Sequence, residues 1–275
     1  PKHCIQAATL GYTTHCFEPS PKSYARLESG IEGIVDNEVK SRLMPYRYAA
    51  SDTTGIMIPF RSTGGTGDHV GEYDMWRMER RAKSPENESV IDRKKRGEII
   101  EVPTIRLDNF VTNDLMGARS QEHRLSPSEV YLLKVDTQGY EPSIFAGLAN
   151  TLKAGAVKYM IFEFWPRGMD LMAGTENSCS AGTGVLNTLV EAGYILYALG
   201  VASHPKAPLG GTNLRKEGRT RPMDIITTAD AYCQWFLDVE GRHPSSPGGD
   251  EYRFGYWSDF LAVAPGTELP VDLLQ

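Results

Sequence analysis

Three acidic residues, Glu18, Asp136 and Glu163, each stand at the end of a short apolar or β-prone segment. A single acid in such a position is more often a helix cap or a surface residue, but recurrence after three such segments indicates a common site. At the carboxyl edge of a parallel α/β sheet, carboxylates can accept hydrogen bonds from ribose hydroxyls or take a proton as a general base. The sequence therefore predicts a site for a nucleotide-type ligand at such an edge.

Residues 130–163 contain the elements that would position two of these acids. An apolar run of strand length stops at Asp136, and a turn and a segment with apolar side chains at helical spacing follow it. Gly155 ends the helical pattern, and a second apolar strand ends at Glu163. A strand, a helix and a strand in this order pair in parallel, so we expect both acids at one edge of the sheet.

The rest of the chain alternates in the same way between β-prone and helical segments. Predicted strands lie at residues 12–17, 46–50, 56–60, 99–107, 194–199 and 257–264, and predicted helices at 3–10, 21–31, 107–111, 184–192 and 229–240. Residues 62–97 predict a polar excursion or a partly disordered loop, and residues 165–183 and 203–222 predict irregular loops. Without a repeat or a clear linker, the pattern predicts a single domain over residues 1–275 with an α/β layer structure.

The bulk composition narrows the classes of partner. A formal net charge of −6 over 275 residues argues against a nucleic-acid backbone as the main partner. No apolar run approaches the roughly 20 residues that span a bilayer, so we expect no membrane segment in this chain. The oligomeric state is not predicted.

The cysteines and the first residues bear on the cellular compartment. Four cysteines are widely spaced without a CxxC pattern, which predicts free thiols in a reducing compartment rather than a zinc site or a disulfide framework. The first residues do not have the pattern of a signal peptide. Because the chain begins with Pro1 rather than Met, a targeting segment can be missing, and the cytoplasm is only the default expectation.

Several short motifs follow one another along the chain. The most specific is LLKVDTQGYE at residues 132–141, and it is accompanied by FEPSP at 17–21, LDNF at 107–110, IFEF at 161–164 and WSDFLAVA at 257–264. Over roughly residues 5–200, this order resembles the FkbM family of S-adenosylmethionine-dependent methyltransferases. The resemblance implies the doubly wound, mostly parallel, Rossmann-like sheet of class I methyltransferases with an antiparallel last strand. It also implies S-adenosyl-L-methionine as cofactor and O-methylation of a hydroxyl on a sugar, a glycan or another small metabolite.

The resemblance also implies roles for single residues. Glu18, on a turn stiffened by Pro19, matches the acid that binds the cofactor ribose, and Asp136 matches the acid beside the methionine part and the methyl group. Glu163 matches the family position at the end of the fifth strand, near the substrate opening. The turn near the adenine and the remainder of the Asp136 motif are matched by Ala50, Ser51, Asp52, Gln138, Gly139 and Glu141. Candidates for the general base are Asp136, Glu163 and Glu141, with a first-turn helix position as the alternative for Glu141. A metal shared by Asp136 and Glu163 is less favoured than no metal.

The chain departs from the family pattern before Glu18. Only 17 residues precede Glu18, and none forms the GxGxxG-like turn that lets a backbone approach its cofactor. The glycines within residues 64–67 follow no strong strand and predict a flexible loop instead. We therefore expect the first strand and its glycine loop to be missing from this chain.

Two other functions remain open from the sequence. One is another nucleotide-cofactor enzyme, such as an oxidoreductase, on a similar sheet. This alternative leaves the LLKVDTQGYE motif unexplained. The other is a non-catalytic binding module that keeps the methyltransferase fold. The segments 62–97, 165–183 and 203–222 are expected to shape the acceptor pocket, and such loops vary freely on one scaffold, so the acceptor is not predicted.

Overall fold

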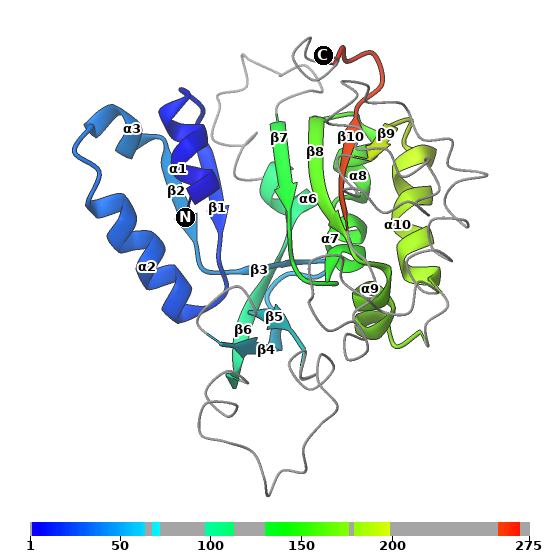
Figure 1. Cartoon of the computed structure of the whole chain (residues 1–275), viewed down its shortest axis with the longest axis horizontal. Helices are drawn as coiled ribbons and strands as arrows, with labels where there is room; N and C mark the ends of the chain where they lie inside the picture. The colour runs from blue at the N-terminus through cyan, green and yellow to red at the C-terminus, as the bar shows by residue number, and fades with distance from the viewer. Residues whose placement is uncertain are drawn as a thin grey trace, which may run out of the picture.

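Helices and strands alternate along much of the chain, as the sequence predicts (Figure 1). The computed structural model describes residues 2–63, 68–71, 97–112, 130–175, 179–198 and 258–269. The helices in these residues are α1 (Lys2–Thr9), α2 (Pro21–Glu32), α3 (Asn37–Ser41), α6 (Leu107–Phe110), α7 (Glu141–Gly147), α8 (Ala149–Lys153), α9 (Pro166–Ala173) and α10 (Ser180–Glu191). The strands are β1 (Thr14–Phe17), β2 (Leu43–Tyr46), β3 (Ala49–Ser51), β4 (Met57–Ser62), β5 (His69–Val70), β6 (Glu98–Arg106), β7 (Val130–Val135), β8 (Val157–Phe164), β9 (Ile195–Ala198) and β10 (Ser258–Val263).

The predicted strand–helix–strand unit is confirmed. β7 and β8 pair in parallel, with Val130 opposite Val157 and Val135 opposite Phe162, and α7 and α8 connect them. β10 lies between β8 and β9 and is antiparallel to both, as expected for the last strand. The sheet order β7-β8-β10-β9 therefore leaves β7 at one edge.

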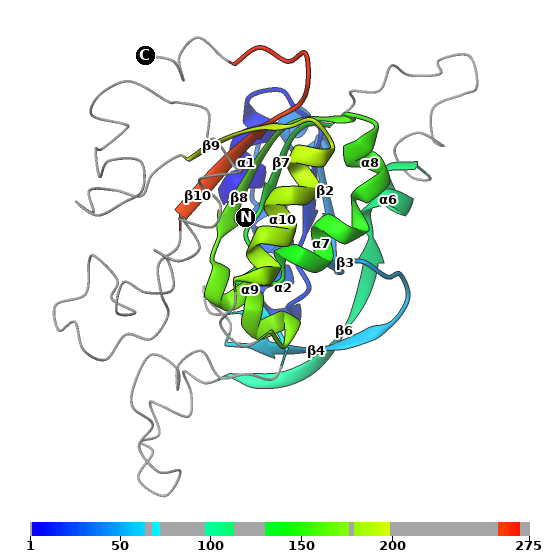
Figure 2. The same cartoon turned by 90° about the vertical axis from the view of Figure 1, so that its right-hand side faces the viewer.

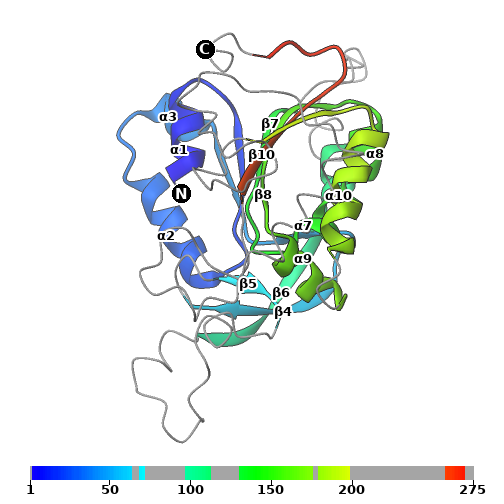
Figure 3. The ribbon, with the colours of Figure 1, turned by 45° about the vertical axis from the view of Figure 1, so that its right-hand side comes forward.

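The main core lies between this sheet and the helices α7, α9 and α10, which cover one of its faces (Figures 2 and 3). Alternate residues of β8 point into it, and Met160, Phe162 and Phe164 are fully buried. Phe260 of β10 stacks on Phe164 with ring centroids 4.7 Å apart, and Phe145 of α7 meets Phe162 edge-on. Because large rings fill this layer, the end of β8 that carries Glu163 is firmly held.

A smaller sheet contains β1 and β2, which pair in parallel. α1 contacts β1 and α2 contacts β2, on the side away from β7 (Figure 3). Among the described residues, no backbone pairing joins β1 to β7, and side chains bridge the two parts instead. Tyr12 stacks on Tyr131 at 5.2 Å, and Phe110 meets Phe17 edge-on at 5.1 Å. A single doubly wound sheet is thus not confirmed, and the absence of the first strand stays a prediction.

The prediction of free thiols is wrong for three cysteines. Cys4 of α1 and Cys16 of β1 form a disulfide, and Cys179 is disulfide-bonded as well. Cys4 and Cys16 come together because α1 packs back across β1, with the two Cα atoms 6.2 Å apart. The disulfide therefore cross-links α1 to the strand that immediately precedes Glu18.

A third sheet has the order β3-β6-β4-β5 and lies below the other two in Figure 1. β3 and β6 are parallel, while β4 is antiparallel to both β6 and β5. The predicted polar excursion at 62–97 starts at the last residue of β4, contains β5 and stops just before β6, and its residues 64–67 and 72–96 lie outside the described part. The strand predicted over 46–50 is wrong in its bounds, because β2 ends at Tyr46 and β3 begins at Ala49.

Two other predictions need correction. Residues 165–183 are not irregular throughout: α9 begins at Pro166, ends before Gly174 at a φ of 69°, and α10 begins at Ser180. The helix predicted from Glu141 onward is interrupted at Leu148. The predictions for residues 203–222 and 229–240 fall outside the described residues. Within the described part, no helix is both long and apolar enough to span a membrane.

Candidate active site

Asp136, Gln138 and Glu163 lie together, as the motif positions predict. Asp136 follows β7, and Glu163 is the penultimate residue of β8. The parallel pairing of β7 with β8 brings their carboxyl ends to the same edge. The Gln138 side-chain amide donates to Asp136 Oδ1 at 3.2 Å and to Glu163 Oε2 at 3.1 Å. A single NH₂ group therefore bridges the two carboxyl groups.

The carboxylate of Glu141 binds the turn that carries Gln138. Oε1 of Glu141 accepts from the backbone N–H and the hydroxyl of Thr137 at 2.8 and 2.9 Å, and Oε2 accepts from Gly139 N–H at 2.9 Å. Glu141 is fully buried, and burial raises the pKa of its carboxyl, against the hydrogen bonds from Thr137 that lower the pKa. These contacts fit a structural residue better than a base that meets a substrate.

The backbone conformation of the turn restricts which residues can occupy positions 138 and 139. Gln138 has a φ of 57° and Gly139 a φ of 98°, so both occupy the left-handed region. A Cβ on Gly139 would lie 2.5 Å from the carbonyl carbon of Gly168, which belongs to α9. The absence of a Cβ on Gly139 thus allows α9 to pack against the turn. Gly139 is therefore required by the backbone, whereas Gln138 supplies the side-chain amide that bridges the two acids.

Asp136 and Glu163, the two acids bridged by Gln138, lie in different electrostatic environments. Lys134 Nζ lies 3.2 Å from Asp136 Oδ2, whose side chain is 47% exposed. Burial, together with the negative charges of Asp136, Glu141 and Asp259, raises the pKa of Glu163 to about 8, and Lys134 opposes this shift. Asp259 faces Glu163 because the two residues are paired in the β8–β10 register. Glu163 is therefore mostly protonated at neutral pH and becomes a competent proton acceptor near pH 8.

The residues predicted near the adenine adjoin this turn, with one correction. Ala50 and Ser51 lie within β3, in the third sheet, and only Asp52 is in the turn that follows. Ser51 is buried; its hydroxyl donates to Asp52 Oδ1 at 3.1 Å and lies 2.9 Å from the Tyr140 hydroxyl. A Cβ on Gly147 of α7 would lie 2.0 Å from the Ser51 carbonyl oxygen, so α7 packs directly on β3.

Glu18 directly follows β1 of the smaller sheet. The carboxyl ends of β1, β7 and β8 point toward the same side of the molecule (Figure 1). Oε1 of Glu18 accepts from Ser20 N–H at 3.0 Å across Pro19, and Ser20 is the N-cap of α2. Burial raises the pKa of Glu18, the Ser20 bond lowers it, and the charge of Asp68 raises it further. No hydrogen bond or ion pair among the described residues joins Glu18 to the Gln138 bridge.

Sequence reasoning missed Lys134, Asp259 and Tyr140 as parts of this site. Lys134 has a recognisable signal, since it is the one charge within an apolar strand and stands two residues before Asp136. Asp259 has none, because its approach to Glu163 depends on the register of β10. No group of three or more His, Cys, Asp or Glu side chains suited to a metal occurs among the described residues.

Comparison with protein families identifies the family of the chain. The family model of the methyltransferase FkbM domain matches residues 2–196, which is well over half of the chain. Comparisons with curated proteins and with solved structures give no match. The matched range includes the Glu18 turn, the Gln138 bridge and β8, but ends before β10. The chain therefore belongs to the FkbM methyltransferase family.

Proposed function

We propose that this methyltransferase is S-adenosyl-L-methionine-dependent and methylates a hydroxyl oxygen of a sugar or another small metabolite. Family membership supports methyl transfer. The observation that carries the finer proposal is the Gln138 bridge, which holds an exposed carboxylate and a partly buried carboxyl group of high pKa side by side at the ends of β7 and β8.

The residues present suit this cofactor in their chemistry. Carboxylates accept hydrogen bonds from hydroxyl and ammonium groups, and the cofactor has a ribose diol and an amino group. Glu18 would hold the ribose, Asp136 the amino group of the methionine part, and the β3 turn at Asp52 the region of the adenine. When bound, the cofactor supplies an electrophilic sulfonium methyl group.

Glu163 is the proposed general base. With a pKa of about 8, its ionised form can take the proton of the acceptor hydroxyl as the oxygen gains the methyl group. The Gln138 amide holds Oε2 in place and donates to the ionised carboxylate. We do not assign this role to Glu141, because both of its oxygens accept hydrogen bonds within the turn.

We further propose that a strand parallel to β1 and β7 joins the two sheets into one doubly wound sheet. β7 is an edge strand among the described residues, yet it carries Tyr131 and Leu132, which are 44% and 48% exposed. An apolar edge of this kind is normally paired or covered. Such a strand would also connect the part that holds Glu18 with the part that holds Asp136.

Isothermal titration with S-adenosyl-L-methionine tests the cofactor assignment. The ligand is titrated into this chain and into the protein extended by any native residues that precede Pro1. We expect binding by at least one of the two, a loss of binding with Glu18→Ala or Asp136→Ala, and unchanged binding with Glu191→Gln, an exposed acid at the end of α10. Failure of both wild-type proteins to bind would contradict the assignment and favour another nucleotide cofactor or a non-catalytic module.

Methyl transfer is then measured as formation of S-adenosylhomocysteine with sugars and small hydroxylated metabolites as acceptors. Glu163→Gln is expected to bind the cofactor normally but to lose at least about 100-fold in turnover, as is usual for a missing general base. Wild-type turnover is expected to rise with pH and level off above pH 8, since Glu163 has a pKa of about 8. Full activity of Glu163→Gln would remove Glu163 from the mechanism.

A further inference from the structure

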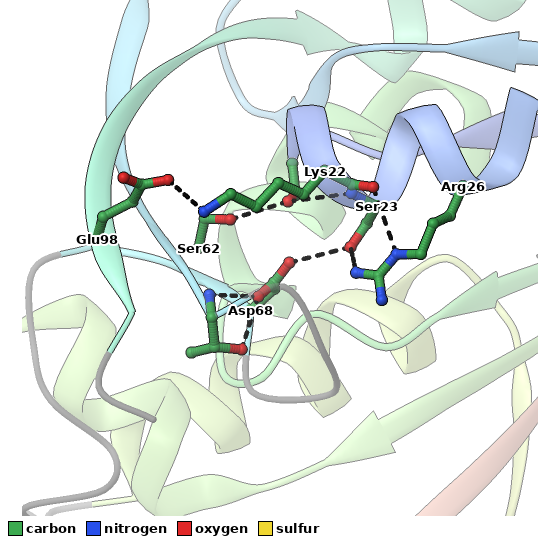
Figure 4. Close-up of polar contacts among 8 residues, drawn as sticks. Lys22, Ser23, Arg26, Ser62, Asp68 and Glu98 are labelled. Carbon is green, nitrogen blue, oxygen red and sulfur yellow. Dashed lines mark hydrogen bonds and ion pairs between the residues drawn. The ribbon is translucent and has the colours of Figure 1, made fainter. Parts of the chain in front are cut away.

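The short hairpin formed by β4 and β5 is attached to the start of α2 through Asp68 (Figure 4). Oδ1 of Asp68 accepts from the backbone N–H of Thr63 at 2.6 Å and from its hydroxyl at 2.8 Å. Oδ2 accepts from the Ser23 hydroxyl at 3.2 Å. Asp68 therefore holds the end of β4 with one oxygen and the first turn of α2 with the other.

A second contact joins the same two elements one turn earlier. The hydroxyls of Ser20 and Ser62 lie 3.0 Å apart, and both residues are buried, at 0% and 2% exposure. Ser20 is the N-cap of α2, and its hydroxyl accepts from Ser23 N–H at 3.5 Å. Buried hydroxyl pairs of this kind cost free energy when one partner is removed, so the contact fixes where the helix begins.

The chain of contacts ends at Glu18. The backbone N–H of Ser20 donates to Glu18 Oε1, so the direction of this carboxylate depends on the position of Ser20. The charge of Asp68 also acts on Glu18, where it opposes ionisation, while that of Arg26 favours it. Arg26 in turn donates to the Ser23 hydroxyl at 3.1 Å. The groups that face Glu18 from α2 and from the hairpin thus belong to one network.

We propose that Asp68 is a positioning residue for Glu18: through Ser23 and the Ser20–Ser62 contact, it sets the angle at which Glu18 meets the cofactor ribose. This inference rests on the proposed role of Glu18. A vicinal diol requires a carboxylate held to within about 0.5 Å and 10–20° to accept both hydrogen bonds, and three residues of turn between β1 and α2 do not supply that rigidity alone. The β4–β5 hairpin supplies it from a different sheet.

The matched control is the Lys22–Glu98 ion pair. It also joins α2 to the third sheet, through β6, at 2.6 Å, but both side chains are more than half exposed. The Lys22 side chain is bonded to Glu98 rather than to Ser20 or Glu18, and the Lys22 carbonyl, which accepts from Arg26 at 3.4 Å, is retained in an alanine variant. Lys22→Ala and Asp68→Ala each remove a contact between α2 and the third sheet, whereas positioning of Glu18 involves only Asp68.

Titration with S-adenosylhomocysteine, which has the same ribose, tests the proposal in whichever form of the protein binds the cofactor. We expect Asp68→Ala to raise Kd roughly tenfold, Lys22→Ala to leave it unchanged, and Asp68→Asn to stay within about threefold, since an amide can accept from Thr63 and donate to Ser23. In a Glu18→Ala background, Asp68→Ala is expected to cause no further loss, because it acts through Glu18. Melting curves of all variants are recorded alongside.

The outcomes separate the two proposals. If wild type binds and Glu18→Ala weakens binding, but Asp68→Ala does not, only the positioning role is overturned. The positioning role is also overturned if the losses of affinity from Glu18→Ala and Asp68→Ala are additive, or if Lys22→Ala weakens binding as much as Asp68→Ala. If Asp68→Ala fails to fold, Asp68→Asn decides: binding as weak as that of Glu18→Ala overturns the positioning role. If no form of the wild-type protein binds, the proposed function falls, and the positioning role falls with it.

Discussion

Replacing Glu163 by glutamine is expected to make the protein more stable at alkaline pH than the wild type. In the folded protein the pKa of Glu163 is raised from 4.5 to about 8, first because the carboxyl is buried and then because Asp136, Glu141 and Asp259 are negative. Below about pH 4.5, both the folded and the unfolded chain keep this proton. Between about pH 4.5 and 8, the unfolded chain releases the proton and the folded chain retains it, so the free energy of unfolding falls as pH rises.

The size of the effect follows from the pKa difference. At about 1.4 kcal/mol per pH unit, a shift from 4.5 to about 8 corresponds to roughly 5 kcal/mol lost by pH 9. Glu163 keeps some contact with solvent, which screens the neighbouring charges, so we expect about 3 kcal/mol. Glutamine resembles the protonated acid in shape and can still accept from Gln138, and it has no proton to lose in this range.

Urea unfolding of wild type and Glu163→Gln at pH 5, 7 and 9 measures this difference. The variant is expected to be within about 1 kcal/mol of wild type at pH 5 and about 3 kcal/mol more stable at pH 9. Glu191→Gln, at the exposed end of α10, is the control and should shift by less than about 0.5 kcal/mol at every pH. A Glu163→Gln difference that stays constant from pH 5 to pH 9 would show that Glu163 ionises normally, and the argument for it as the base would fail.

Three further changes test the framework of the site. Gly139→Ala is expected to lower the free energy of unfolding by about 2–4 kcal/mol, because its Cβ would meet the Gly168 backbone at 2.5 Å. Gly155 is the control: it also has a positive φ, but nothing lies within 4 Å of its Cβ position, so Gly155→Ala should cost only about 1 kcal/mol in the same urea unfolding assay. Glu141→Gln is expected to cost about 1–3 kcal/mol and to weaken cofactor binding, since an amide cannot accept all three of its buried hydrogen bonds; unchanged stability and affinity would contradict this. Cys4→Ser is expected to cost about 3 kcal/mol in non-reducing urea unfolding, and the further change Cys16→Ser should add almost nothing, since the same cross-link is already lost; additive losses would show that the two cysteines are not paired.

The sequence predicted those parts of the fold that depend on local pattern. The strand–turn–helix–strand of residues 130–163 was predictable because its apolar runs, its QG turn and its final glycine all favour the same structure. α9 was missed because Gly168 in its first turn disfavours a helix. The absence of a Cβ at Gly168 leaves room for the Trp165 ring, a contact that the local pattern does not reveal.

Contacts between distant segments account for most of the rest. The Cys4–Cys16 disulfide depends on how α1 packs across β1, which no spacing rule contains. The high pKa of Glu163 depends partly on Asp259, which lies 96 positions later in the chain and reaches Glu163 only through the antiparallel register of β10. The contacts of Asp68 could not be predicted from the sequence, because β5 has only two residues and lies in a segment whose composition favours a loop.

The two halves of the proposed site differ in what holds them. Asp136 and Glu163 belong to one sheet, and both the Gln138 bridge and the buried Glu141 fix them relative to each other. Glu18 belongs to another sheet and depends on α2 and the β4–β5 hairpin. Because the ribose and the methyl group of one cofactor molecule would have to contact both halves, binding should order them relative to each other. Phe17 of β1 packs directly against the main core and its ring meets Phe110 edge-on, so the cofactor affinity should depend on the packing between the sheets as well as on the carboxylates themselves.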